Sequence, residues 1–121
     1  MDTFAHEARP DAITMMTLHN AKGVEYPVVI IVGVEQENLP IWRSLDDPRK
    51  LNEERRVLYV GITRAKNAVY LFSTNDRDDG FYREPSRFAF EIPPQYIRHF
   101  RIFGNGKVEE IRRTGRSRKK P

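Results

Sequence analysis

Apolar residues gather in a few short runs along the chain, and the spacing within each run predicts its structure. Ile13–Leu18 is a short apolar, partly β-branched segment, and Val28–Val32 is a continuous apolar run bounded by Pro27 and Gly33. Continuous apolarity is typical of strands covered on both faces, as in a parallel sheet. The residues between the two runs suffice for a loop with one or two helical turns. The pattern therefore predicts a strand, a short crossover and a second strand.

A helical pattern follows further along. Residues 34–50 hold two prolines and many charges and are predicted to run over the surface. Asn52 is the expected N-cap of a helix that ends near residues 64–66, because the positions after it form one apolar side at helical spacing. That side comprises Val57, Leu58, Ile62 and Ala65. The segment 68–72 then predicts another buried strand.

The C-terminal third is rich in turn residues. Residues 76–80 predict an acidic turn, and residues 86–91 predict a short helix that Pro93 and Pro94 interrupt. Residues 96–103 and 107–111 are short strand-like segments around a Gly-Asn-Gly turn, which is a strong hairpin signal. A single hairpin is marginal in water, so we expect it to need a partner surface.

Length and composition limit the class of protein. A chain of 121 residues with 39% hydrophobic content can bury one modest core, which excludes two full domains. It contains no cysteine, no apolar run long enough to span a bilayer and no basic-then-apolar leader at Met1. We therefore expect a cytoplasmic protein with no membrane association and no disulfide or thiolate metal site.

The net charge of +4 is unevenly distributed. Six of the 21 basic residues lie in the last ten positions, which leaves 15 basic residues against 17 acids in the body of the chain. The body is therefore slightly acidic. Residues 112–121 either form a disordered, solvated tail or bind phosphate by counterion release, and the sequence leaves both open.

No self-contained active site is visible in the residue pattern. The chain has no GxxxxGK[ST] phosphate loop, no GxGxxG and no HExxH, and its histidines (His6, His19 and His99) are scattered. Polar residues instead follow the first predicted strand, where open α/β sheets bind ligands. They are Thr17, His19, Lys22, Gly23 and Glu25.

Arg64 lies at the end of the predicted helix, next to Thr63. A guanidinium is always charged and offers forked donors, which suits phosphate recognition. From the residues alone, a phosphate role and a structural role for Arg64 are equally open.

Two longer stretches carry a family resemblance. Residues 13–29 (ITMMTLHNAKGVEYPVV) resemble motif V of UvrD/Rep/PcrA-like superfamily 1 DNA helicases, a pattern close to TLHxAKGLEFxxV. Residues 53–65 (EERRVLYVGITRA) resemble motif VI, EERRLxYVGxTRA, and residues 85–93 resemble the segment that follows it. Val24 and Tyr26 replace the usual Leu and Phe with similar volume.

The resemblance covers roughly residues 12–95 and implies an α/β fold. The implied fold is part of the second RecA-like motor domain, a parallel sheet of the P-loop NTPase type with flanking helices. We expect residues 1–11 to be a flexible lead-in, residues 96–111 a β-hairpin and residues 112–121 a basic disordered tail.

The resemblance also implies roles for eight residues. Arg64 would be the arginine finger that reaches the γ-phosphate of ATP, with Gly23 and Glu25 also at the nucleotide. The others are assigned to single-stranded DNA (Thr17, His19 and Asn20) and to coupling between the two sites (Lys22 and Thr63).

Structural interpretations of these residues stay open beside the functional ones. Thr17 could end a strand, His19 could cap a turn, and Glu25 could pair with Lys22 or Arg43. Arg55 and Arg56 could be solvated helix charges, and we expect them to be structural rather than functional. We weigh two functions: a motor-domain fragment of an ATP-dependent 3′→5′ DNA helicase, and a stand-alone, non-enzymatic module, derived from a helicase, that binds nucleic acid or protein.

Several parts of the family's motor are absent from this sequence. The P-loop lysine, the Walker B acids and the motif IV arginine would all precede residue 12 in such a helicase. We therefore expect a helicase fragment without ATPase activity of its own, whose ATP and Mg²⁺ are bound mainly by a partner, the N-terminal P-loop motor domain. The hairpin resembles the opening of a small Tudor-like module that is associated with protein partners, RNA polymerase among them.

Overall fold

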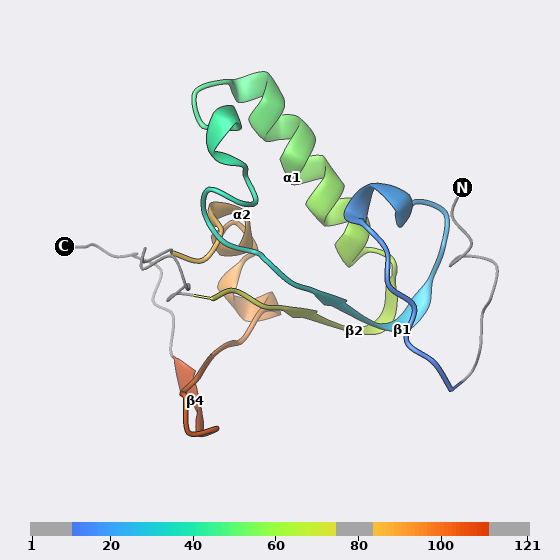
Figure 1. Cartoon of the computed structure of the whole chain (residues 1–121), viewed down its shortest axis with the longest axis vertical. Helices are drawn as coiled ribbons and strands as arrows, with labels where there is room; N and C mark the ends of the chain where they lie inside the picture. Colours follow the sequence, from blue (N-terminus) through green and yellow to red (C-terminus); the bar gives the residue numbers. More distant parts are fainter. Residues whose placement is uncertain (1–10, 75–83, 112–121) are drawn as a thin grey trace.

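The computed structural model describes residues 11–74 and 84–111 (Figure 1). Its elements in chain order are η2 (Leu18–Asn20), β1 (Tyr26–Ile31), η3 (Trp42–Ser44), α1 (Pro48–Ile62), β2 (Ala65–Leu71), α2 (Arg87–Phe90), η4 (Pro94–Tyr96), β3 (His99–Ile102) and β4 (Val108–Ile111). The predicted lead-in up to residue 10, the acidic turn at 76–80 and the basic tail at 112–121 lie outside the described residues.

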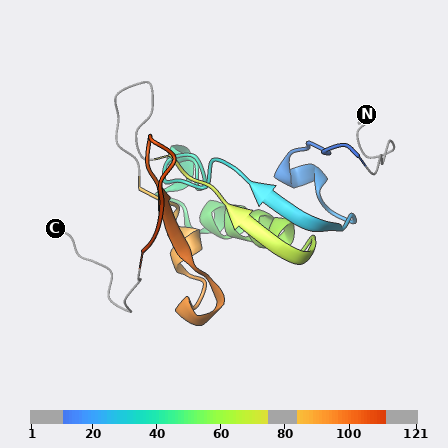
Figure 2. The same cartoon turned by 90° about the horizontal axis from the view of Figure 1, so that it is seen from below.

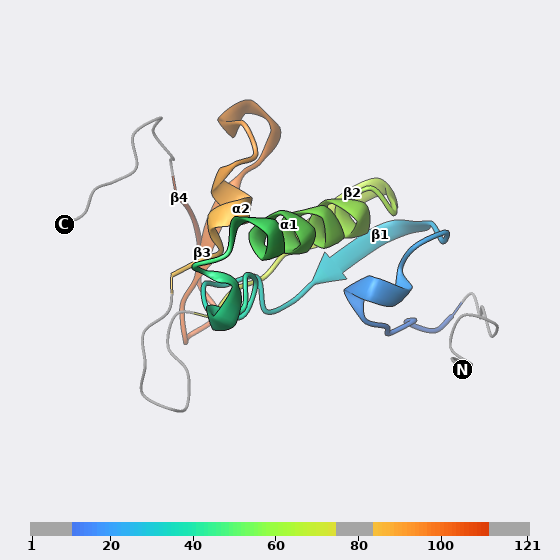
Figure 3. The ribbon, with the colours of Figure 1, turned by 90° about the horizontal axis from the view of Figure 1, so that it is seen from above.

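A two-stranded parallel sheet and one long helix form the main body. β1 and β2 pair in parallel from Tyr26 opposite Ala65 to Ile31 opposite Leu71, which confirms both predicted strands. The crossover that joins them contains α1, which lies across one face of the sheet (Figure 3). This β1–α1–β2 unit confirms the α/β class, whereas its assignment to part of a RecA-like sheet stays a prediction.

The core lies between α1 and the sheet. Leu58 of α1 and Phe88 of α2 are fully buried, and Ile31 and Val34 pack against them. The other face of the sheet is turned away from α1 (Figure 2). There Val28 is 49% exposed and Tyr70 is 53% exposed. The prediction that these strands are covered on both faces is therefore wrong in this chain.

The predicted first strand, residues 13–18, is not a strand. Ile13 is 91% exposed and Met15 is 73% exposed, and the segment continues into η2. A strand forms when its N–H and C=O groups pair with a neighbour, and none of the described strands pairs with residues 13–18. The prediction that residues 19–26 form a crossover between two strands is therefore also wrong, because residues 13–18 are not a strand.

Helix α1 begins earlier than the sequence predicted. Its N-cap is Asp47, whose Oδ1 accepts hydrogen bonds from the backbone N–H groups of Arg49 at 3.0 Å and Lys50 at 3.4 Å. Pro48 occupies the first turn, where a missing N–H costs nothing. Asn52 is therefore inside the helix rather than its cap, because the Asp-Pro pair is the stronger start signal. The helix ends at Ile62, so Ala65 belongs to β2.

The segment between β1 and α1 is folded tightly against the body. It was predicted to run over the surface, yet Glu35 is 2% exposed and Ser44 is 4% exposed. Glu54 of α1 accepts hydrogen bonds from the Ile41 N–H and the Ser44 hydroxyl, and Glu35 accepts one from the Thr74 N–H at 2.8 Å. The two carboxylates satisfy backbone groups that would otherwise be left without partners.

The C-terminal elements agree with the sequence. Ser86 caps α2 by accepting a hydrogen bond from the Phe88 N–H at 3.1 Å, and β3 pairs with β4 as an antiparallel hairpin. The hairpin contacts the body through Phe90 and His99, whose rings stack with their centroids 5.5 Å apart. None of the helices in the described residues is long and apolar enough to cross a membrane.

Candidate functional site

The two motif-like stretches meet where β1 and β2 begin. The Tyr26 N–H donates a hydrogen bond to the Arg64 carbonyl at 2.9 Å, next to the pairing of Tyr26 with Ala65. This contact places the loop that carries Gly23 and Glu25 beside the C-terminal end of α1. The expected grouping at a carboxyl edge is wrong, because these residues precede β1 and β2 and lie at the amino edge of the sheet.

The Arg64 side chain bridges these two segments. Its Nε donates to the Val60 carbonyl at 3.2 Å, its Nη1 to the Val24 carbonyl at 3.5 Å, and its Nη2 to the Thr63 hydroxyl at 3.3 Å. The Thr63 hydroxyl itself donates to the Val60 carbonyl at 2.8 Å. Carbonyls at a helix C-terminus carry partial negative charge and stabilise a cation there.

No carboxylate in the described part of the chain pairs with Arg64. Its neutral partners lie at distances of 3.2 to 3.5 Å, near the long end of the hydrogen-bond range. The guanidinium is half-buried and its charge is not neutralised by an ion pair. An anion that binds Arg64 would therefore not have to displace a carboxylate.

The loop before β1 holds the other nucleotide candidates. Gly23 has φ of 86°, a left-handed conformation that favours glycine, and a Cβ at this position would meet nothing within 4 Å. The left-handed turn explains why position 23 is a glycine, because no atom of the described structure lies close enough to exclude a Cβ there. Glu25 and Lys22 are exposed, and no ion pair joins Glu25 to Lys22 or Arg43.

The three DNA candidates cluster on one short element. Thr17 is the N-cap residue of η2 without a side-chain cap hydrogen bond, and His19 and Asn20 lie within η2. All three are exposed. The structure therefore brings them together and leaves their polar groups accessible, but separates them from Arg64 by the loop containing Lys22.

Helix α1 positions η2 through a close contact at Gly61. A Cβ added to Gly61 would lie 2.5 Å from Cδ2 of Leu18. Leu18 thus occupies space that only glycine leaves free on this side of α1. The same helix consequently carries Arg64 at its end and supports the segment that holds the DNA candidates.

One side of α1 contains a groove of about 420 Å³. Its lining residues are Asn52, Arg55, Arg56, Tyr59, Val60 and Thr63. The groove runs along one side of the helix toward the end that holds Arg64. Among the described residues no group of three or more His, Cys, Asp or Glu is arranged to hold a metal ion.

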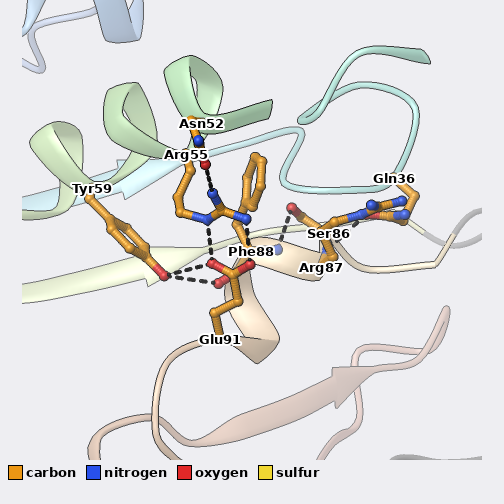
Figure 4. Close-up of polar contacts among 8 residues, drawn as sticks. All are labelled: Gln36, Asn52, Arg55, Tyr59, Ser86, Arg87, Phe88 and Glu91. Atoms are coloured by element: carbon orange, nitrogen blue, oxygen red, sulfur yellow. Dashed lines mark hydrogen bonds and ion pairs between the residues drawn. The ribbon is translucent and has the colours of Figure 1, made fainter. Parts of the chain in front are cut away.

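The sequence did not reveal a polar cluster between α1 and α2 (Figure 4). Arg55 Nε and Nη2 donate to the two carboxylate oxygens of Glu91 at 2.7 and 2.9 Å, and Nη1 donates to Asn52. The Arg55 guanidinium also lies 5.1 Å from the ring centroid of Phe88. Arg55 therefore has the expected structural role, which it fulfils through an ion pair rather than as a solvated helix charge.

Tyr59 joins the same cluster one helical turn later. Its hydroxyl lies 3.3 Å from Glu91 Oε1 and 3.5 Å from the Phe88 carbonyl. Burial raises the pKa of the Tyr59 phenol, and the nearby Glu91 carboxylate raises it further. The hydrogen bond to Glu91 raises the pKa of Arg55. A spacing of four residues between Arg55 and Tyr59 was a helical signal, but nothing in the sequence connected it to Glu91.

Comparison with known proteins identifies relatives over most of the chain. The family model of the UvrD-like helicase C-terminal domain matches residues 2–76. The ATP-dependent DNA helicase UvrD1 of Mycobacterium leprae is 47% identical over 94 residues, which are 75% of this chain and 12% of that protein. DNA helicase II of Escherichia coli is 43% identical over 95 residues, 76% of this chain and 13% of that protein.

A third relative agrees with these two. The ATP-dependent DNA helicase PcrA of Leuconostoc citreum is 45% identical over 91 residues, 71% of this chain and 12% of that protein. The chain thus spans about an eighth of the length of the curated relatives it matches. The resemblance inferred from the two motif-like stretches is confirmed at the level of the family.

Proposed function

This chain belongs to the family of UvrD-like helicase C-terminal domains, and we propose that it is the part of an ATP-dependent 3′→5′ DNA helicase motor that carries the arginine finger and contacts to single-stranded DNA. In this proposal the P-loop half of the motor binds most of the ATP and its Mg²⁺. Closure of the cleft between the two halves brings Arg64 to the γ-phosphate. Hydrolysis reopens the cleft and moves the strand held by η2.

The observation that supports the proposal is the set of contacts made by the Arg64 guanidinium. Its charge has no carboxylate partner among the described residues, and its three hydrogen bonds go to neutral acceptors. An arginine that stabilises charge in phosphoryl transfer must exchange its contacts for phosphate oxygens, which bind a guanidinium more strongly than carbonyls do. Gly23 and Glu25 lie in the neighbouring loop and are assigned to the nucleotide as well.

The DNA contacts are assigned to the exposed polar groups of η2. Thr17, His19 and Asn20 offer hydroxyl, imidazole and amide donors, which suit backbone contacts that do not depend on base sequence. Lys22 lies between η2 and Gly23, and Thr63 contacts Arg64 directly. We assign these two residues to coupling between the nucleotide and the DNA.

ATP turnover tests the role of Arg64. The chain, joined to the P-loop half of a UvrD-type helicase or mixed with it, should hydrolyse ATP, and Arg64→Ala should lower kcat by about a thousandfold or more with a smaller loss of ATP binding. Arg49→Ala is the matched control, because Arg49 is an exposed arginine at the opposite end of α1. Normal turnover by the Arg64 variant would refute the proposed function.

Binding of single-stranded DNA tests the role of η2. Fluorescence anisotropy across a salt series should show binding by a chain that ends at residue 111, and His19→Ala should weaken it. Gln95→Ala is the control, because Gln95 is an exposed residue in another 3-10 turn, η4. If all binding disappears with the basic tail, only sequence-independent electrostatics is present, and the alternative of a stand-alone nucleic-acid-binding module is favoured.

The hairpin is the part of the chain that we assign to a protein partner. Ile102 and Val108 pair directly across its strands and are 64% and 57% exposed. Exposed apolar pairs on a two-stranded hairpin favour contact with a second surface. RNA polymerase, which the resemblance to a Tudor-like module implied, is one partner to test by pull-down with and without the hairpin.

A further inference from the structure

The cluster between α1 and α2 holds the helix that carries Arg64. Arg55 and Tyr59 lie one turn apart on α1, and both contact the Glu91 carboxylate, which follows directly after α2 (Figure 4). The bidentate geometry of Arg55 and Glu91 fixes orientation as well as distance. Phe88, under the Arg55 guanidinium, is fully buried in the core. Glu91 therefore connects the middle of α1 to the buried core through α2.

A short path leads from this cluster to Arg64. The Thr63 N–H donates to the Tyr59 carbonyl at 3.0 Å, and the Thr63 hydroxyl accepts from Arg64 Nη2. Tyr59, which Glu91 contacts, is thus hydrogen-bonded to the residue that holds the Arg64 side chain. A displacement of this last turn of α1 would move the guanidinium directly.

From this path we propose that Glu91 is a positioning residue for Arg64: through Arg55 and Tyr59 it sets where the last turn of α1 holds the guanidinium. The inference rests on the proposed function of Arg64. Catalytic groups lose activity when they are displaced by about 1 Å, because charge stabilisation depends on geometry. Glu91 itself touches no nucleotide in this proposal and acts only through α1.

A second ion pair of the same kind provides the comparison. Arg98 and Glu110 of the hairpin region form a bidentate pair at 3.2 and 3.0 Å, and the Arg98 guanidinium lies 5.1 Å from the ring centroid of Phe100. Each pair therefore consists of a bidentate arginine–glutamate contact with a phenylalanine ring beside the guanidinium. The two pairs differ in position, because Arg98 and Glu110 pair within the hairpin region, whereas Arg55 and Glu91 join α1 to the end of α2.

The test measures DNA-stimulated ATP hydrolysis by the chain joined to its P-loop half. Glu91→Gln should lower kcat about tenfold and leave KM for ATP within about twofold, because placement of the catalytic charge is lost and binding of the nucleotide is not. Tyr59→Phe, which removes one of the contacts, should lower kcat by a smaller factor. Glu110→Gln is the matched control and should leave both constants unchanged.

The Arg64→Ala background separates positioning from a general loss of structure. If Glu91 acts through Arg64, adding Glu91→Gln to Arg64→Ala should not lower kcat further. The inference is overturned if Glu91→Gln leaves kcat unchanged, or if it lowers kcat equally in both backgrounds. If Arg64→Ala alone leaves turnover normal, the proposed function fails and the positioning role fails with it; a normal Glu91 variant beside an inactive Arg64 variant removes only the positioning role.

Discussion

Phe88 should be the most sensitive core position in the C-terminal half of the chain. Its side chain is 0% exposed and packs with Leu58, Ile31 and Val34 in a small core. Removing a buried phenylalanine ring typically costs about 3 to 5 kcal/mol, because transfer energy is lost and a cavity remains. Natural domains have a total stability of about 5 to 15 kcal/mol, so Phe88→Ala should remove a large part of the stability of the chain.

Phe100 allows burial to be separated from the other contacts of the ring. Both rings lie 5.1 Å from an arginine that is paired with a glutamate, but Phe100 is 49% exposed. Phe100→Ala should therefore cost only about 1 kcal/mol, roughly half of the transfer energy of a fully buried side chain and without a cavity. The difference in the free energy of unfolding between Phe88→Ala and Phe100→Ala therefore measures what burial of the Phe88 ring contributes to stability.

Urea denaturation followed by circular dichroism measures both free energies of unfolding. Phe88→Leu provides a milder change that should remain folded, with a cost of about 1 to 2 kcal/mol. A cost below about 0.5 kcal/mol for Phe88→Leu, or equal costs for Phe88→Ala and Phe100→Ala, would show that α2 is not part of the core. The contacts of Glu91 with α1 would then no longer be anchored to the core through α2.

Three further predictions concern α1. Asp47→Ala should lower the free energy of unfolding by about 1 kcal/mol in urea denaturation, because the N-cap hydrogen bonds are lost. Gly61→Ala with Leu18→Ala should cost at least about 0.5 kcal/mol less than the sum of the single changes, since the added Cβ displaces Leu18. Because the pKa of Tyr59 is raised above the ordinary 10.0, wild-type stability should fall as pH rises past that value, and Tyr59→Phe should remove this part of the decline; equal declines would contradict it.

The elements that sequence predicted best have local signals. β1 and β2 are apolar runs bounded by turn residues, and the hairpin is marked by its Gly-Asn-Gly turn, so each was visible in a short window. The start of α1 was placed five residues late because Asn52 resembles a cap, whereas Asp47 before Pro48 is the actual one. The run at 13–18 has the composition of a strand but finds no pairing strand among the described residues.

In the candidate site too, residues that lie close together in the sequence were predictable, whereas contacts between distant segments were not. Thr63 and Arg64 were identified from a contiguous stretch, and their closeness to Gly23 and Glu25 follows from pairing of β1 with β2. The ion pair of Arg55 was not predictable, because its partner lies 36 positions away on a segment whose fold depends on packing. Contacts of this kind are set by tertiary structure, and no spacing rule in a single sequence exposes them.

The parallel pairing of β1 with β2 also affects folding during synthesis, because β1 is made well before the strand with which it pairs. Each residue of β1 pairs with one about 40 positions later. At a translation rate of about 5 to 20 residues per second, β1 waits about 2 to 8 s before its partner has been made. During that interval Val28–Val32 is an uncharged run of β-branched residues, and such runs pair readily with other chains. A ribosome that pauses within α1 lengthens this interval, so codon choice between residues 32 and 65 should affect the soluble yield of the chain.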